Sequence, residues 1–377
     1  QSNQHIHYLT EHIGIHKKAN LNSGDTLLFQ VVRDIFECIL SIKIEWNLYQ
    51  VWDEFDRDVI EQINKENDAL VLGGGGLLLK DQKGSDISNS GWQWNCSSKN
   101  TNGIKIPLFI FAIGYNRFYN QDDFDSNFVD SINAIASMSS FFGLRNNGSI
   151  HAVRKYLSDD NQKKAKIYRQ FCPTTMVSLI YPDLKIIAEN HAKKEAKILS
   201  FNAAFDRTDM RFSNSDKVFN EICKLIKYAE DKGWCIVACS HKEMDREIES
   251  FLVDNNVNFK TKNLTSSSPM EIMEHYAQVD LSVGMRGHSQ MIPFGFNKPI
   301  ISLISHDKLQ FFLDDLELSE FGINLNSNNL FDQFVRILDN IEINKDQVEE
   351  VLKSKQKYIW KETFDNFSIM KNIMRLS

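Results

Sequence analysis

The seven residues Val283–Ser289 (VGMRGHS) carry the side chains best suited to chemistry in this chain. They follow the apolar run 279–283, which predicts a strand, and precede an apolar segment that predicts a helix. Arg286 offers a planar fork for phosphate or carboxylate, helix N–H groups add to the positive field, and His288 can donate or accept a proton. The segment therefore predicts an anion pocket with an acid–base group. The plainer interpretation is a helix capped by Ser289 beside a surface arginine and a packed histidine.

Four consecutive glycines follow the apolar run 69–72, and they make up four of the 17 glycines in the chain: Gly73, Gly74, Gly75 and Gly76. Backbone without side chains can approach a ligand closely and present N–H groups to an anion or a hydroxyl. The cluster is neither GxGxxG nor a phosphate-binding loop, because no Gly-Lys-Ser or Gly-Lys-Thr follows. We therefore expect a strand that ends in a ligand-binding loop, with a tight strand-to-helix turn as the alternative.

Two shorter segments resemble helix starts. Asn22 and Asp25 flank a glycine turn in NSGD, where Asp25 can cap a helix with a regularly spaced apolar face. Arg145 precedes Asn-Asn-Gly-Ser149 at an expected strand-to-helix junction. Each segment is weak evidence alone. Together, four strand-end loops rich in Gly, Arg, Asn and Ser indicate one shared cleft.

Other reactive side chains rank lower. We expect no metal site from four early histidines, because no carboxylate or cysteine completes the set: His5, His7, His12 and His16. Cys239 precedes Ser-His241 without a nucleophile elbow, so a buried thiol is expected. Trp92 and Trp94 lie in a polar segment that fits a sugar-stacking loop and an ordinary packed loop equally well.

These segments must be positioned by an α/β framework, because short apolar runs alternate with amphipathic stretches over almost the whole chain. Two prolines and a weaker alternation mark a domain boundary near 170–185. The expected architecture is GT-B-like, with two Rossmann-like domains facing a cleft, residues 1–175 and 186–345, and a helical tail, 346–377. Predicted strands are 69–72, 108–113, 141–144, 198–201, 234–240, 279–283 and 299–304. One predicted helix begins near Asp25. The other predicted helices cover 130–137, 149–157, 215–232, 243–253, 270–278 and 308–316.

Composition excludes several classes of protein. The chain has 377 residues, 42% of them hydrophobic and 25% charged, which excludes disorder and leaves room for two domains. A net charge of −7 argues against non-specific nucleic-acid binding. Six cysteines without a CxxC pair favour reduced thiols and a cytoplasmic protein. No run is long enough to span a bilayer, and no signal peptide is evident.

The order of these motifs resembles that of the polysaccharide pyruvyltransferase family, from about Asn22 to about Leu318. The resemblance rests on NSGDTLL, ALVLGGGGLL, IGYNRF, LRNNGS and the most specific block, VDLSVGMRGHSQMIPFGFNKPIISLISHDK. The chain departs from the family at Gly287, where a leucine is common. It also departs at Asn146, where Asp is usual, and at Cys172, which begins CPTT in place of Asp-Pro-Ala.

The resemblance implies a transferase that moves pyruvate from phosphoenolpyruvate onto two hydroxyls of a sugar as a cyclic ketal. Phosphoenolpyruvate is then a co-substrate, and no cofactor is expected. The acceptor is a sugar of a surface polysaccharide or its lipid-linked precursor. A lipid-linked acceptor is compatible with peripheral contact between the protein and the inner face of a membrane. The implied catalytic residues are His288 as the acid, Arg286, and Asp25, with Asp25 or Asp81 assisting His288. The implied donor-binding residues are Arg286, His288, Ser289, Gly284, Arg145 and Lys308. The implied acceptor side or cleft wall is Asn22 with Gly73, Gly74, Gly75 and Gly76.

Two alternatives stay open from the sequence. A GT-B glycosyltransferase with a nucleotide-activated sugar would use the same anion pocket. A non-catalytic scaffold on this fold would have no need of clustered Gly, Arg and His at strand ends.

Overall fold

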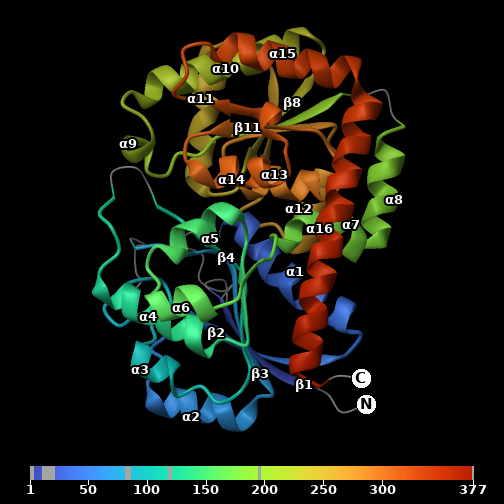
Figure 1. Cartoon of the computed structure of the whole chain (residues 1–377). Coiled ribbons are helices and arrows are strands. Elements are labelled where there is room, and N and C mark those ends of the chain that lie inside the picture. The colour runs from blue at the N-terminus through green and yellow to red at the C-terminus, as the bar shows by residue number, and fades with distance from the viewer. Residues whose placement is uncertain (1–3, 11–21, 81–85, 118–120, 194–196, 376–377) are drawn as a thin grey trace. The chain divides into compact units, whose positions relative to one another are not determined.

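The computed structural model describes residues 4–10, 22–80, 86–117, 121–193 and 197–375, with residues 4–10 described by their backbone (Figure 1). The described chain forms two compact units. The first contains residues 4–10, 32–173 and 361–375, and the second contains 22–31 and 174–360. The domain boundaries expected from the sequence stay a prediction.

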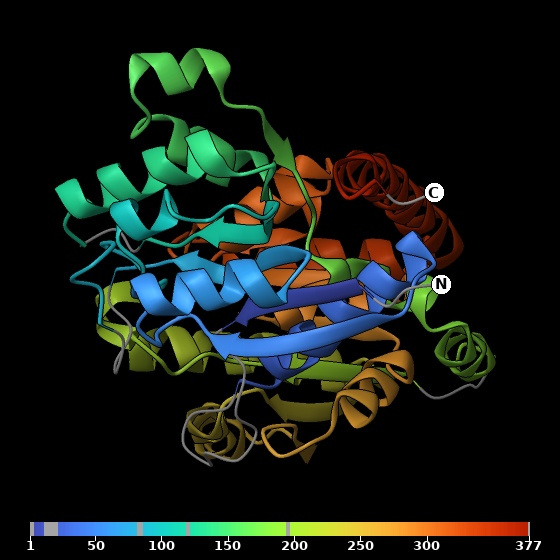
Figure 2. The same cartoon turned by 90° about the horizontal axis from the view of Figure 1, so that it is seen from below.

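The first unit is built on a sheet of parallel strands. Among the described residues it has six strands in the order β2-β1-β3-β4-β5-β6, and Figure 2 shows β1 and β2 side by side, running the same way. Its elements are β1 (Gln4–Thr10), α1 (Ser23–Leu40, whose first turns belong to the second unit), β2 (Ile44–Gln50), α2 (Arg57–Glu66), β3 (Ala69–Leu78), α3 (Ser98–Thr101), β4 (Leu108–Tyr115), α4 (Ser126–Met138), β5 (Phe141–Leu144), α5 (Asn147–Arg154), α6 (Asp159–Lys164) and β6 (Ile167–Arg169).

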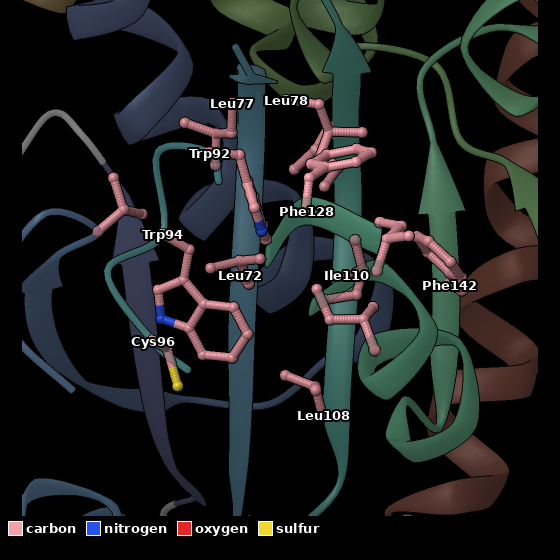
Figure 3. Close-up of a cluster of buried hydrophobic side chains, with 14 of the residues drawn as sticks. Leu72, Leu77, Leu78, Trp92, Trp94, Cys96, Leu108, Ile110, Phe128 and Phe142 are labelled. Carbon is pink, nitrogen blue, oxygen red and sulfur yellow. The ribbon is translucent and has the colours of Figure 1, made fainter. Parts of the chain in front are cut away.

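The two tryptophans of the polar segment lie in the core of the first unit. Trp92 and Trp94 are fully buried and pack edge to face, with ring centroids 6.0 Å apart. Figure 3 shows them among apolar side chains of β3 and β4. The indole N–H of Trp92 donates to the Ser131 hydroxyl at 2.9 Å. The sugar-stacking interpretation is therefore wrong and the packed loop is confirmed, because fully buried rings offer no face to a sugar.

The end of the last helix, α16 (Lys345–Ile373), also belongs to the first unit. Phe367 packs against Phe36 and Phe111, with ring centroids 4.8 and 5.6 Å apart. Arg169 makes two hydrogen bonds of 2.9 and 2.7 Å to the carboxylate of Glu362. These contacts attach a segment from the end of the chain to a core built from its beginning.

The second unit repeats the parallel arrangement. Its described strands form a six-stranded sheet in the order β12-β11-β10-β7-β8-β9. Its remaining elements are η1 (Pro173–Met176), α7 (Val177–Ile180), α8 (Pro182–His191), β7 (Ile198–Asn202), α9 (Thr208–Arg211), α10 (Ser215–Asp231), β8 (Cys235–Ser240), η2 (Glu243–Glu247), α11 (Ile248–Asp254), β9 (Phe259–Asn263), α12 (Pro269–Ala277), β10 (Leu281–Gly284), α13 (His288–Phe294), β11 (Ile300–Ile304), α14 (Asp307–Asp315), η3 (Ser319–Phe321), β12 (Gly322–Asn324) and α15 (Leu330–Ile343).

Helices cover both faces of the second sheet. In Figure 1, α10, α11 and α15 lie on one side of β8 and β11, and α12, α13 and α14 lie on the other. The first turns of α1 join the second group, because Leu27 and Val31 share a buried cluster with Tyr276 and Ile292. Burial of this apolar stripe positions the start of α1, and the NSGD motif with it, beside α12 and α13.

The predicted α/β class with parallel sheets is confirmed, and most predicted elements lie within a few residues of the observed ones. Two details are wrong. Strand β3 does not end at the glycines but continues through them to Leu78. The predicted helix 243–253 is a 3₁₀ turn, η2, followed by α11. None of the helices in the described part of the chain combines the length and the apolar stretch needed to cross a bilayer.

Candidate active site

In the second unit, the loop between β10 and α13 lies at the carboxyl ends of the central strands. Parallel neighbours end at the same edge of a sheet, so the ends of β7, β8 and β10 bring their following residues together. Asn202 ends β7 and holds this loop: its carbonyl accepts from the Met285 N–H at 3.1 Å and its side chain from the Arg286 N–H at 3.3 Å.

The guanidinium of Arg286 is held by two carboxylates. Its Nε donates to Asp245 at 2.7 Å, and its Nη2 lies 2.5 Å from Asp245 and 3.1 Å from Asp206. Burial opposes the charge, but the two carboxylates outweigh it and raise the pKa of Arg286 above its ordinary value. Only 9% of Arg286 is exposed, and Nη1 has no hydrogen-bond partner within the described chain. Arg286 therefore presents one nitrogen to a ligand instead of the full fork that the sequence suggested.

Asp206 is shared between two arginines. Arg211, at the end of α9, donates from Nε to the Asp206 carbonyl at 2.9 Å and from Nη1 to the Ser305 hydroxyl at 2.7 Å. Burial disfavours the Asp206 carboxylate, yet the adjacent cations, first Arg286 and then Arg211, hold its pKa far below the ordinary value. Burial lowers the pKa of Arg211 to about 10, so the group stays charged near neutral pH.

Asp245 is a functional residue that the sequence reasoning missed. Besides Arg286 it accepts the backbone N–H groups of His241 and Lys242, both at 3.0 Å, and the Asn202 amide at 3.3 Å. It is 1% exposed. The sequence offered only a local sign of its structural role: an aspartate three residues after Lys242 fits the N3 position of a helical turn. Nothing local pointed to Arg286, which lies 41 residues further along the chain.

His288 and Asp25 form a pair in the same unit. The His288 Nδ1 lies 3.5 Å from an Asp25 carboxylate oxygen, and both side chains are mostly buried. The NSGD and MRGHS motifs thus meet, as the shared-site prediction requires of them. The predicted cap is wrong: Asp25 lies in the first turn of α1, and the side chain of Asn22 accepts the Gly24 N–H at 3.1 Å.

Gly284 and Ser289 shape the loop around Arg286. The Ser289 hydroxyl donates to the Arg286 carbonyl at 2.8 Å. A Cβ on Gly284 would overlap that hydroxyl, so the glycine leaves room for it. The contacts described for Gly284 and Ser289 are with the Arg286 loop itself, and their role in binding the donor stays a prediction.

Gly287 has a similar relation to Lys308, in the first turn of α14. A Cβ on Gly287 would lie 2.7 Å from Lys308 Cε. The lysine stem therefore occupies the space where family members commonly have a leucine. Lys308 thereby lies beside the segment that carries Arg286 and His288, and its donor-binding role stays a prediction.

Two glycine substitutions should differ in the size of their effect on stability. Gly24→Ala is expected to lower the free energy of unfolding by about 1–2 kcal/mol, because the new Cβ would overlap the His288 ring and outweigh the helix preference of alanine. Gly287→Ala should change it by less than about 0.5 kcal/mol, because the end of Lys308 can move aside. Urea unfolding of both variants measures this, and equal effects would contradict the packing argument.

Two histidines, the buried His241 and the partly buried His275, lie against Tyr276 in the same unit. Burial lowers the pKa of His241 to about 4 and of His275 to about 3, so both are neutral. His241 shares a 2.5 Å hydrogen bond with the Tyr276 hydroxyl, and its carbonyl accepts the Ser23 N–H at 3.0 Å. Burial also raises the pKa of the Cys239 thiol to about 12, which confirms the buried, unreactive thiol expected from the sequence.

These histidines predict a loss of stability in acid. Their folded pKa values lie below the ordinary 6.5, so the unfolded chain binds more protons. Stability present above about pH 6.5 should therefore fall by about 1 kcal/mol per pH unit for each histidine down to about pH 4. Denaturant unfolding across this range measures the slope, and His241→Asn should reduce it by about half. A slope unchanged in that variant would contradict the assignment.

In the first unit, the glycine cluster has a packing role. A Cβ on Gly73 would overlap the Phe111 carbonyl of β4, and one on Gly76 would overlap the side-chain amide of Asn116. Asn116 donates to the Gly76 carbonyl at 3.3 Å and accepts from Arg145 Nη2 at 2.9 Å. The expectation of a glycine loop beyond the strand is thus wrong, because close approach of β4 requires the missing side chains.

The structure does bring the three first-unit motifs together. The glycines of β3, Asn116 after β4 and Arg145 after β5 meet at the carboxyl ends of these neighbouring strands. Asn146 caps α5 by accepting the Ser149 N–H at 2.7 Å, a role that the family's usual aspartate could also fill. The Ser149 hydroxyl in turn accepts the Tyr115 N–H at 3.0 Å.

Some predicted residues lie elsewhere. Asn22 belongs to the second unit with His288, whereas Gly73, Gly74, Gly75, Gly76 and Arg145 belong to the first, and the cleft expected between them stays a prediction. Asp81, His12 and His16 lie outside the described residues, as do the side chains of His5 and His7. Among the side chains that are described, no group of three His, Cys, Asp or Glu residues could hold a metal ion.

Comparison with known proteins adds the family and the fold. A sequence model described as polysaccharide pyruvyl transferase matches residues 22–307, more than half of the chain. An O-GlcNAc transferase mutant from Thermobaculum terrenum superposes with a TM-score of 0.52 at 10% identity, over 99% of this chain and 67% of that one. The S. aureus MnaA–UDP co-structure gives 0.50 at 11% identity, over 99% and 98%. The UDP-GlcNAc 2-epimerase of Methanocaldococcus jannaschii gives 0.51 at 10% identity, over 89% and 92%.

At these identities the structural likeness shows the fold alone. It confirms the predicted GT-B-like α/β class with a C-terminal helical region. No curated protein matches this chain.

Proposed function

Because the chain belongs to the polysaccharide pyruvyl transferase family, we propose that it transfers pyruvate from phosphoenolpyruvate to two hydroxyls of a saccharide, forming a cyclic ketal. The acceptor in this proposal is a sugar of a surface polysaccharide or its lipid-linked precursor, the latter reached by peripheral contact at a membrane face. One observation carries the proposal: His288, the first residue of α13 and two residues after Arg286, lies 3.5 Å from the Asp25 carboxylate of α1.

The proposed reaction needs an acid for the first step. A proton added to the methylene carbon of phosphoenolpyruvate turns it into a methyl group and leaves an oxocarbenium-like centre at the adjacent carbon. His288 is suited to deliver this proton, because an imidazole can act as a general acid and the Asp25 carboxylate at 3.5 Å orients the ring.

The remaining steps close the ketal. One sugar hydroxyl attacks the electrophilic carbon. Its proton passes to His288 and replaces the proton that His288 delivered in the first step. The carbon–oxygen bond to phosphate breaks, the second hydroxyl attacks the same carbon, and its proton leaves with the phosphate. The products are the pyruvate ketal and inorganic phosphate.

The donor carries a phosphate and a carboxylate, and both need positive charge. In the proposed site, Nη1 of Arg286 and the ammonium of Lys308 supply it from either side of Gly287. The two carboxylates on the other face of Arg286 hold its guanidinium in one orientation, so the nitrogen that remains is already aimed before the donor arrives.

The test is to incubate the protein with phosphoenolpyruvate and a panel of free and lipid-linked saccharides, and to follow phosphate release and the mass of the acceptor. The proposal expects one phosphate released per pyruvyl group gained. Thermal stabilisation by phosphoenolpyruvate but not by nucleotides would support it. Stabilisation by a nucleotide sugar, with transfer of its sugar, would replace it by the glycosyltransferase alternative. Absence of phosphate release with every acceptor would overturn it.

A further inference from the structure

A cavity of about 350 Å³ lies in the second unit, away from Arg286 and His288. It is lined by α7, α8, α16 and the turn between α13 and β11. That turn precedes the amino end of β11, whereas Arg286 follows the carboxyl end of the parallel neighbour β10. The cavity is therefore at the opposite edge of the sheet from the candidate active site, and its volume is in the range of small-molecule sites.

Positive charge dominates the lining. Four lysines, Lys185, Lys298, Lys353 and Lys357, face two glutamates, Glu189 and Glu349. Lys185 and Lys353 each pair with a glutamate on their own helix, at 4.0 and 2.8 Å. Those pairs are exposed and contribute little to stability, so their lysines can turn to a ligand at small cost.

Lys298 differs from the other three because it is buried. Only 5% of it is exposed, and within the described chain its ammonium makes one hydrogen bond, to the Ala188 carbonyl at 3.3 Å. Burial lowers its pKa, against the attraction of Asp280 and Glu349. Two of the three N–H donors of the buried Lys298 ammonium thus lack protein acceptors within the described chain. An anion in the cavity would supply those acceptors.

Asn297 adds a second unsatisfied group. Its side-chain oxygen is buried without a hydrogen-bond partner in the described structure. The residue has a φ of +58°, in the left-handed region, which Asn tolerates better than most residues. Asn297 lines the same cavity as Lys298, and a ligand hydroxyl would satisfy its unpaired oxygen.

We propose that this cavity binds a small anion that also carries hydroxyl groups, such as a sugar phosphate, at a site separate from the catalytic one. The anionic group pairs with Lys298 and the exposed lysines, and a hydroxyl donates to Asn297. The proposal does not depend on the pyruvyltransferase reaction.

Calorimetric titration of the full chain with glucose 6-phosphate, inorganic phosphate and glucose tests the site. Glucose 6-phosphate should bind most tightly, phosphate more weakly and glucose not at all. Lys298→Met should weaken glucose 6-phosphate binding at least roughly tenfold, because it removes a charged hydrogen bond. Asn297→Gly, which keeps the left-handed backbone, should weaken glucose 6-phosphate but not phosphate. Lys224→Met on the exposed face of α10 is the matched control.

Two further variants keep the result decisive. Lys353→Met, at an exposed position, should also weaken glucose 6-phosphate, and it serves if the Lys298 variant melts early. Lys308→Met reports binding at the candidate active site and should leave this binding unchanged. Binding lost in the Lys308 variant but kept in the Lys298 and Lys353 variants would overturn the proposal. So would no heat from any probe up to about 10 mM.

Discussion

Replacing His288 with Asn is expected to lower kcat for pyruvyl transfer by about 10²–10⁴-fold while the protein stays folded. Asparagine keeps a polar side chain of similar size at the start of α13 but cannot deliver a proton. Asp25→Asn should lower kcat less, because it removes the carboxylate that lies 3.5 Å from the imidazole and orients it, and leaves the acid itself in place. Phosphate release at saturating phosphoenolpyruvate measures both effects.

The matched control is His151→Asn, at an exposed position on α5, which should leave kcat unchanged. Circular dichroism separates lost chemistry from lost structure. Full activity in the His288 variant would exclude it as the acid. An effect of Asp25→Asn larger than that of His288→Asn would instead make the carboxylate the proton donor.

Replacing Asp245 with Asn is expected to lower the free energy of unfolding by about 3–5 kcal/mol, because it leaves a buried arginine without its principal counter-charge. The same carboxylate accepts two backbone N–H groups and the Asn202 amide, so its loss also loosens the loop after β8. Arg286 would keep only Asp206, at 3.1 Å. Denaturant unfolding measures the change.

Two other substitutions bracket this result. Asp206→Asn should cost less than Asp245→Asn, about 1–3 kcal/mol, because its carboxylate is 21% accessible and lies farther from Arg286 but also pairs with the buried Arg211. Asp254→Asn, at an exposed position at the end of α11, should have no measurable effect. If Asp245→Asn were as mild as Asp254→Asn, Asp245 would not be what holds Arg286.

The fold and part of the site follow from local patterns. Apolar runs located the central strands, since a buried parallel strand needs a continuous apolar run. The edge strands β2 and β9 were not predicted, because their sequences mix polar and apolar residues. Their half-exposed positions permit such a mixture. His288 and Asp25 could be placed in one site because each lies in a short motif at a strand end or helix start.

What could not be predicted depends on contacts between distant segments. Asp245 and Asp206 lie 41 and 80 residues before Arg286, and no local spacing pairs them with it. The glycines were misinterpreted for a similar reason. Their need for bare backbone comes from Phe111 and Asn116, and the chain around Gly73 carries no sign of either neighbour.

The path of the chain also sets the order in which the parts of the first unit are synthesised and can assemble. Phe367 and Glu362 complete a core whose other residues end near position 173. A ribosome adds about 5–20 residues per second, so these side chains emerge roughly 10–40 s after the rest of that core. The first unit to be synthesised is thus the last to be completed. During that interval Phe36 and Phe111 lack the Phe367 ring that packs against both of them in the folded chain.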